Sequence, residues 1–148
     1  MRVAICCSSY SRSLDDYVRR SIQRAAENFR AHGHDCPDWS PRGGLYIDKV
    51  RNDLASDELV QGADAVLFWA ADQTIYCPAD VDLAALFNIG PVVGAAYVSR
   101  QEPPFYVLRV PDGDGGSRRV DAAEMCGHVE PFPVFWIGAG ALWVTAQA

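Results

Sequence analysis

The sequence predicts an α/β protein whose mostly parallel, twisted sheet is flanked by helices and followed by an antiparallel C-terminal portion. Continuous apolar runs at Val3–Cys7, Ala65–Trp69 and Pro91–Tyr97 are typical of strands that are covered on both faces. Segments with apolar residues three and four positions apart alternate with these runs as far as residue 97. Strands dominate after that point, which predicts the antiparallel portion.

Length and charge narrow the class of protein further. The chain has 148 residues and a formal net charge of −6. A chain of this length can bury one core without disulfides or a structural metal, so we expect a single domain over residues 1–148. The acidic balance disfavours bulk binding to nucleic acid or to an anionic membrane, because both partners favour a basic face.

Cysteine spacing and hydropathy point to the cytoplasm. The 5 cysteines form no C-x-x-C pair, so a disulfide framework or a structural zinc site is not expected. The first residues begin as a strand and lack the features of a signal peptide. No apolar stretch approaches the roughly 20 residues that cross a bilayer. We therefore expect a cytoplasmic protein with reduced thiols and no membrane partner.

The opening unit is a strand, a polar loop and a helix. Val3–Cys7 is the strand and Ser8–Ser11 the loop. Ser13 can cap the helix that follows, and Gly33 can end it. The apolar face of this helix is formed by Leu14, Tyr17, Val18, Ile22, Ala25, Ala26 and Phe29.

A second helix and a central strand come next. The segment from His34 to Gly44 contains two prolines and reads as a loop. Ile47–Val60 has the helical spacing of apolar residues and is closed by Gly62. Ala65–Trp69 is the expected centre of the sheet.

The remaining elements are shorter. Pro78–Phe87 reads as a short helix, with Pro78 near its first turn. The further strands are Pro91–Tyr97, Phe105–Val110 and Phe135–Val144, and the expected hairpin loop is Pro111–Ser117.

Ligands of open α/β sheets bind at the carboxyl ends of the strands. The positions of interest therefore follow Cys7, Trp69 and Tyr97. Asp72 comes soon after the buried central strand, where an enzyme would place an acid that holds a metal or faces a phosphate. The alternative interpretation of Asp72 is a turn or capping residue.

Four stretches along the chain resemble one known family. In order, they are Val3–Tyr10, Ile47–Leu54, Ala63–Gln73 with Cys77–Pro78 and Leu83–Leu86, and Pro91–Tyr97 with Arg100 and Gly138–Val144. Together they resemble the GT-A type nucleotide-sugar glycosyltransferases, in particular the small family-2-like forms of bacteria and phages. In that family such stretches are the base-binding loop, a helix with an Arg-Asn pair, the strand ending in a D-x-D motif, and the two strands that follow.

The resemblance implies a site for the donor nucleotide sugar. Its residues would be Ser8, Ser9 and Tyr10 at the nucleoside, Arg51 and Asn52 at the ribose or diphosphate, and Tyr97 and Arg100 toward the sugar. Asp72 would be the catalytic acid and would hold a metal ion or the ribose. The implied cofactor is Mn²⁺ or Mg²⁺ bound together with the diphosphate.

The sequence departs from the family at two places. The first acid of the D-x-D motif is replaced by Ala70, so we expect a weak or absent metal site. No segment with the family's acceptor-binding structure and general base follows Gly138–Val144. The sequence therefore leaves two functions open: a glycosyltransferase, and a catalytically degenerate nucleotide-binding or oligomerisation protein of the same fold. A homo-oligomer is also left open.

Several candidate residues have a plainer interpretation. Arg51 could lie on a solvated helix face or pair with Asp48 or Asp57, and Arg100 has a similar alternative. Tyr10 and Tyr76 could stack on a ligand or pack on the core. The remaining candidates are read as ordinary structure: Cys7 as a small buried hydrophobe, Asp112–Asp114 as a turn, and His32, His34 and His128 as loop residues.

Overall fold

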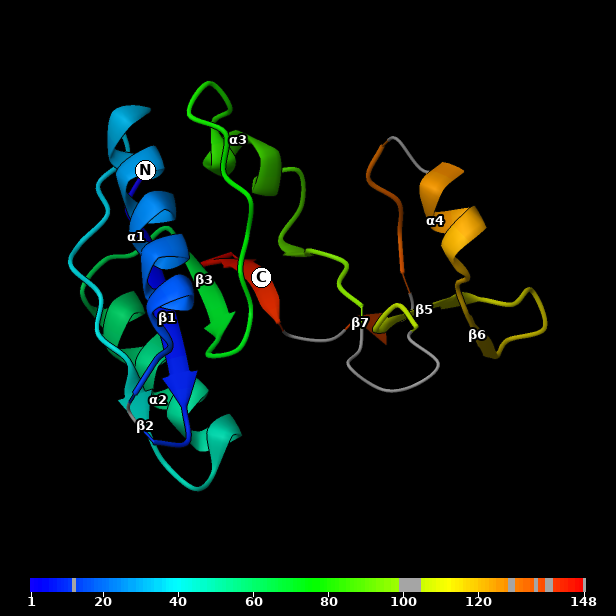
Figure 1. Cartoon of the computed structure of the whole chain (residues 1–148), viewed down its shortest axis with the longest axis horizontal. Coiled ribbons are helices and arrows are strands. Elements are labelled where there is room, and N and C mark those ends of the chain that lie inside the picture. The colour runs from blue at the N-terminus through cyan, green and yellow to red at the C-terminus, as the bar shows by residue number, and fades with distance from the viewer. Residues whose placement is uncertain (12, 99–104, 128–129, 135, 138–139, 148) are drawn as a thin grey trace. The chain divides into compact units, whose positions relative to one another are not determined.

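A computed structural model of the chain describes residues 1–11, 13–98, 105–127, 130–134, 136–137 and 140–147 (Figure 1). These residues form two compact units. Unit 1 consists of Met1–Val93 and Ala139–Ala148, and unit 2 is the inserted segment Gly94–Gly138. In the part of the chain that is described, no helix has the length and apolar character needed to cross a membrane.

Unit 1 is built on a mixed sheet of 5 strands in the order β2-β1-β3-β8-β4. β1 is parallel to β2 and to β3, whereas β8 is antiparallel to β3. The α/β class is thus confirmed, but the sheet is mixed rather than mostly parallel. The elements are β1 (Val3–Ser9), α1 (Asp16–Ala31), β2 (Arg42–Gly43), α2 (Ile47–Val60), β3 (Ala65–Ala70), α3 (Leu83–Phe87), β4 (Val92–Gly94) and β8 (Ala141–Thr145).

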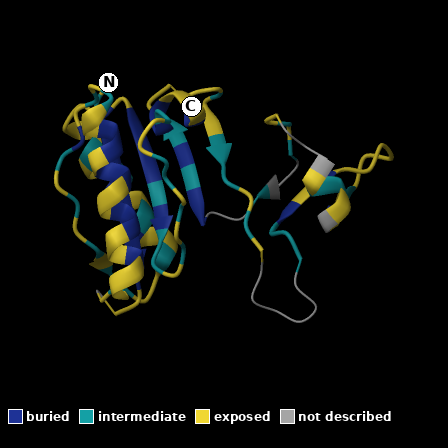
Figure 2. Cartoon of the chain, turned by 45° about the horizontal axis from the view of Figure 1, so that its top comes forward, coloured by how far each residue is buried: buried dark blue, intermediate teal, exposed yellow. Residues whose placement is uncertain are grey.

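Helices cover both faces of the central strands. Cys6 of β1 packs with Val50 and Leu54 of α2 on one face. On the other face, Trp143 of β8 contacts Phe29 of α1 and stacks on Phe87 of α3, at centroid distances of 6.2 and 5.8 Å. Every residue of β1 is therefore buried, as Figure 2 shows for the dark blue core of the sheet.

The buried face of α1 also carries two polar residues, Ser21 and Asn28. The Asn28 amide donates to the carbonyls of Pro78 and Val81 at 3.2 and 2.7 Å, and its oxygen accepts from the Leu83 amide. These contacts draw the segment between β3 and α3 onto α1. The Val81 carbonyl thus bonds to a side chain rather than to a helical amide, and α3 begins at Leu83 rather than at Pro78.

The loop after α1 is joined to the start of α3. Gly33, with a φ of 82°, follows the last turn of α1, as predicted. The Nε2 atom of His34 lies 3.2 Å from Oδ1 of Asp82, and Oδ1 also accepts from the Ala84 amide at the start of α3. His34 is a loop residue, as expected, but it has an acidic partner 48 positions away in the sequence.

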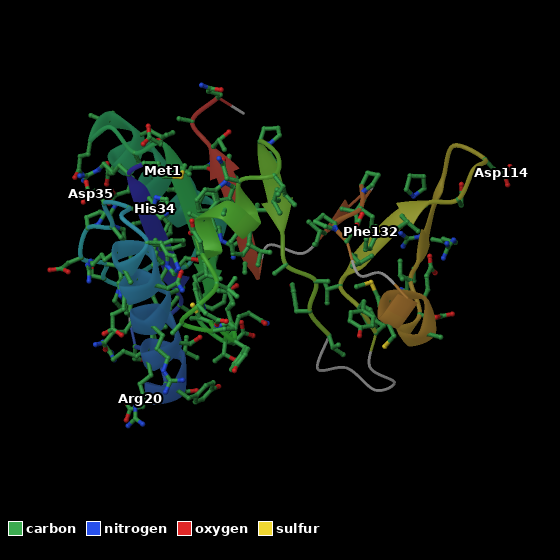
Figure 3. The ribbon with its side chains drawn as sticks, turned by 90° about the horizontal axis from the view of Figure 1, so that it is seen from above. Met1, Arg20, His34, Asp35, Asp114 and Phe132 are labelled. Atoms are coloured by element: carbon green, nitrogen blue, oxygen red, sulfur yellow. The ribbon has the colours of Figure 1, made fainter. Side chains whose placement is uncertain are left out.

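Unit 2 contains β5 (Leu108–Pro111), β6 (Ser117–Arg119), α4 (Ala122–Gly127) and β7 (Trp136–Ile137). β5 pairs antiparallel with β6 and with β7. Asp112 accepts hydrogen bonds from the amides of Asp114 and Gly116, which confirms the predicted turn; Asp114 lies at its tip (Figure 3). The predicted strand Phe135–Val144 is two strands, β7 and β8, which belong to different units.

Candidate functional site

A cleft of about 590 Å³ opens in unit 1 where β1 and β3 end. Because β1 and β3 are parallel, their carboxyl ends meet at one edge of the sheet, where such folds place their ligands. The cleft is lined by Ser8, Ser9, Tyr10, Ser11, Ser13, Leu14, Asp15, Ile47, Arg51, Ala70, Ala71 and Asp72.

The end of β1 supplies a fixed polar wall. Ser8 and Ser9 are buried, whereas Tyr10 is 76 % exposed. The Ser9 hydroxyl donates to the Ser13 carbonyl at 3.2 Å and accepts from the Ser11 amide at 3.3 Å. These bonds fold the loop after β1 back on itself, so that its hydroxyl groups remain at the cleft.

Arg51 reaches the cleft from α2. Val50 and Leu54 of α2 pack on the sheet, which holds Arg51 over the end of β1. Its Nε donates to the Ser8 hydroxyl at 3.3 Å. Burial raises the pKa of the Cys7 thiol to about 11, and the charge of Arg51 acts against this rise. The thiol is thus held protonated, as expected of a small buried hydrophobe.

Two acidic residues on the helix that carries Arg51 form ion pairs with Arg42 and Lys49. Asp57 pairs with Arg42 at 2.7 Å, and the neighbouring Lys49 pairs with Asp53 at 2.6 Å. Asn52, by contrast, is exposed and is not among the residues that line the cleft. The Arg-Asn pair is therefore split by the helix, with only its arginine at the cleft.

Asp72 lies in a tight turn at the end of β3. The Gln73 amide donates to the Ala70 carbonyl at 3.1 Å, which closes a turn with Ala71 and Asp72 at its centre. Asp72 is thus a turn residue and also a residue of the cleft. The turn interpretation is confirmed, and a role for Asp72 in holding a metal ion or facing a phosphate stays a prediction.

The carboxylates at the cleft are Asp72 at the end of β3 and Asp15 at the start of α1. Among the described residues, no three His, Cys, Asp or Glu side chains form a group that could hold a metal ion. Mg²⁺ is often bound by one or two carboxylates together with ligand phosphates. The described residues at the cleft do not form a metal site on their own, and a cation there would need further oxygen ligands from a bound phosphate.

The other candidate residues belong to other parts of the chain. Tyr97 is in unit 2, where its carbonyl accepts from the Val107 amide at 2.9 Å. Arg100 and His128 lie outside the described residues. Tyr76 is 88 % exposed and, like Tyr10, is not a core residue.

Sequence reasoning missed several residues of the cleft. Ser11, Ser13 and Asp15 were read as loop, cap and first-turn residues, and Ile47 as a residue of the apolar face of its helix. All four follow or begin an element at the edge where β1 ends, and this shared position was the signal available for them.

Comparison with protein-family models, with curated proteins and with solved structures finds no match to this chain.

Proposed function

We propose that unit 1 binds the nucleoside diphosphate part of a nucleotide sugar in the cleft at the ends of β1 and β3. One observation carries the proposal: Ser8, Arg51 and Asp72, from three separate elements, line the same cleft. A guanidinium, a hydroxyl and a carboxylate suit the phosphate, the ribose and a phosphate-bound metal ion, respectively.

The N-terminus of α2, which lies at the cleft, also favours the binding of an anion. Ile47 is the first residue of α2, and the side chain of the preceding Tyr46 makes no capping hydrogen bond. Backbone amides at a helix start carry a partial positive charge and bind phosphate groups. Together with Arg51, they would offset the negative charge of a diphosphate in a protein whose net charge is −6.

More specifically, we propose that the chain has a GT-A-like fold. In this proposal Ser8, Ser9 and Tyr10 face the nucleoside, Arg51 the diphosphate, and Asp72 the metal ion or the ribose. Asn52, Tyr97 and Arg100 keep only the support of the sequence resemblance. The proposed reaction, sugar transfer to an acceptor, rests on that resemblance alone.

A second candidate is binding without transfer. Ala70 lines the cleft, and in the resemblance to the GT-A enzymes it stands at the position of the first acid of their metal-binding pair. A methyl group there cannot hold the cation that neutralises a diphosphate leaving group. This favours a degenerate nucleotide-binding protein over an efficient transferase.

The test is a thermal-shift panel of nucleoside diphosphates and their sugars, each with and without Mn²⁺. A ligand at 100 times its dissociation constant stabilises a protein by about 2.7 kcal/mol, which corresponds to a rise in Tm of about 5–10 °C at this size. The matching nucleosides, which lack phosphate, are the control and should shift Tm much less. An unchanged Tm across the whole panel would refute the proposal.

A further inference from the structure

The turn that carries Asp72 is held in place by a hydrogen bond from a buried side chain of β3. The indole N–H of Trp69, a residue with 0 % exposure, donates to the Gln73 carbonyl at 2.9 Å. The Ala70 amide, at the start of the turn, donates to the Gly140 carbonyl at 2.8 Å. The backbone is therefore held on both sides of Asp72 by groups that do not line the cleft.

A second restraint comes from α1. The Ser21 hydroxyl accepts from the Ile75 amide at 2.9 Å and donates to the Ile75 carbonyl at 3.0 Å. A hydroxyl can donate one bond and accept others, so one side chain satisfies both polar backbone groups of Ile75. This double link ties the chain three residues after Asp72 to a helix that packs on the sheet.

Packing alone does not account for a serine at this position. Ser21 is 7 % exposed and lies among the apolar residues Val18, Ile22 and Ala25 on the buried face of α1. A buried hydroxyl is unfavourable unless it is hydrogen-bonded, and an alanine would pack there without that requirement. The hydroxyl instead fixes the position of Ile75, and with it the position of the turn that precedes Ile75.

We propose that Ser21 is a positioning residue for Asp72. Together with the Trp69 indole, its hydroxyl holds the turn so that the Asp72 carboxylate stays on the cleft wall. Ligand affinity then depends on Ser21 through Asp72, although Ser21 does not line the cleft. This inference rests on the proposed nucleotide site.

A double-mutant cycle tests the inference. Calorimetry with uridine diphosphate and guanosine diphosphate, in the presence of Mn²⁺, would compare the unmodified protein with Ser21→Ala, Asp72→Ala and the double variant. Ser21→Ala should raise Kd about three- to tenfold, and Asp72→Ala by at least as much. In the Asp72→Ala background, Ser21→Ala should have no further effect, because the group that it positions is gone.

A control separates positioning from general destabilisation. Ile22→Val removes one buried methyl group from the same helix and leaves the link to Ile75 intact, so it should lower Tm without changing Kd. Hydrogen exchange gives a readout that needs no ligand: Ser21→Ala should speed exchange of the Ile75 amide by at least tenfold. If Ser21→Ala does not fold, Trp69→Phe removes the bond to Gln73 while keeping an aromatic ring, and it should show the same pattern in the cycle.

The outcomes distinguish this inference from the proposed function. If the unmodified protein binds neither of these diphosphates nor any other in the thermal-shift panel, the proposed function fails and the inference fails with it. If the unmodified protein binds a diphosphate, the proposed function stands, and either of two results overturns the positioning role of Ser21. The first is that Asp72→Ala leaves Kd unchanged. The second is that Ser21→Ala raises Kd by the same factor in the unmodified protein and in the Asp72→Ala variant. An Ile75 amide whose exchange is unaffected by Ser21→Ala also overturns it.

Discussion

Arg51 is the residue on which phosphate recognition at the cleft is expected to depend most. A charge-assisted hydrogen bond contributes about 1.5–3 kcal/mol, so Arg51→Ala should weaken diphosphate binding by roughly 10- to 150-fold. Arg20, which is exposed on α1 and projects away from the sheet (Figure 3), provides the matched control. Calorimetry should find equal affinities for Arg20→Ala and the unmodified protein. Equal affinity for Arg51→Ala would remove the arginine from the site.

Because alanine occupies position 70, we expect diphosphate affinity to depend only weakly on a metal ion. With one carboxylate at the turn, Mn²⁺ should change diphosphate affinity by less than about threefold, because a hard cation gains its hold from paired oxygen ligands. Ala70→Asp restores the second acid and should increase the effect of Mn²⁺ to about tenfold or more. Titration with and without Mn²⁺ measures both quantities. A strong Mn²⁺ dependence of the unmodified protein would contradict the prediction.

At the scale of helices and strands, the sequence predicted the elements whose bounds depend on neighbouring residues in the chain. α2 runs over Ile47–Val60 as predicted, because its apolar spacing and the glycine after it are both local signals. The start of α3 was predicted too early, because it depends on Asn28, about 50 residues away. The antiparallel direction of β8 agrees with the predicted antiparallel C-terminal portion, but its place between β3 and β4 was not predicted, since an apolar run does not encode which strand is its neighbour.

In the candidate site, too, residues with a local signal were predicted and a residue that depends on a distant contact was not. Ser8 and Asp72 were predicted because they come at or after the ends of strong strands, and Arg51 because its helix resembles one that carries an Arg-Asn pair in the glycosyltransferase family. Ser21 was not, because its role depends on the backbone of Ile75, and no spacing rule links them. A polar residue in an otherwise apolar helix face is the only local signal of this role, and it does not identify Ile75 as the partner.

The junction of α1 and α3 predicts a pH effect on stability. Burial raises the pKa of Asp82, but hydrogen bonds from His34 and from the Ala85 and Ala84 amides outweigh burial and hold that pKa below its usual value. The folded state therefore binds fewer protons than the unfolded state at this group. Its contribution to stability is present above the ordinary pKa of 3.8 and is lost as the pH falls through the lower folded value.

Asp82→Asn isolates this contribution, because asparagine also caps helices well. Since partly exposed charged pairs contribute about 0.2–1 kcal/mol, the variant should melt a few degrees lower than the unmodified protein at pH 6. The difference should become smaller as the pH falls below 3.8. Melting curves across this range provide the measurement, and a difference that is independent of pH would contradict the prediction.

At the scale of the whole molecule, the reaction itself is the open prediction. Transfer needs a stabilised diphosphate, a positioned acceptor and a base for the acceptor proton. With Ala70 in the cleft, the leaving group lacks a firmly held cation, so we expect slow or no transfer. Donor hydrolysis is the expected residual reaction, because water needs no acceptor pocket.

Release of free nucleotide from a bound donor measures both reactions. The rate should be low and should not change when sugars, peptides or nucleic acids are added as acceptors. Rapid release that depends on one of these acceptors would show that a complete active site exists.

The position of β8 has a consequence for how the protein is made. β8 lies between β3 and β4, so both strands lack their shared neighbour until residues 141–145 have left the ribosome. During synthesis of unit 2, the nascent chain therefore presents two open strand edges next to an apolar core. Such edges pair readily with other chains, so the risk of aggregation is expected to last until β8 has emerged and filled the gap between β3 and β4.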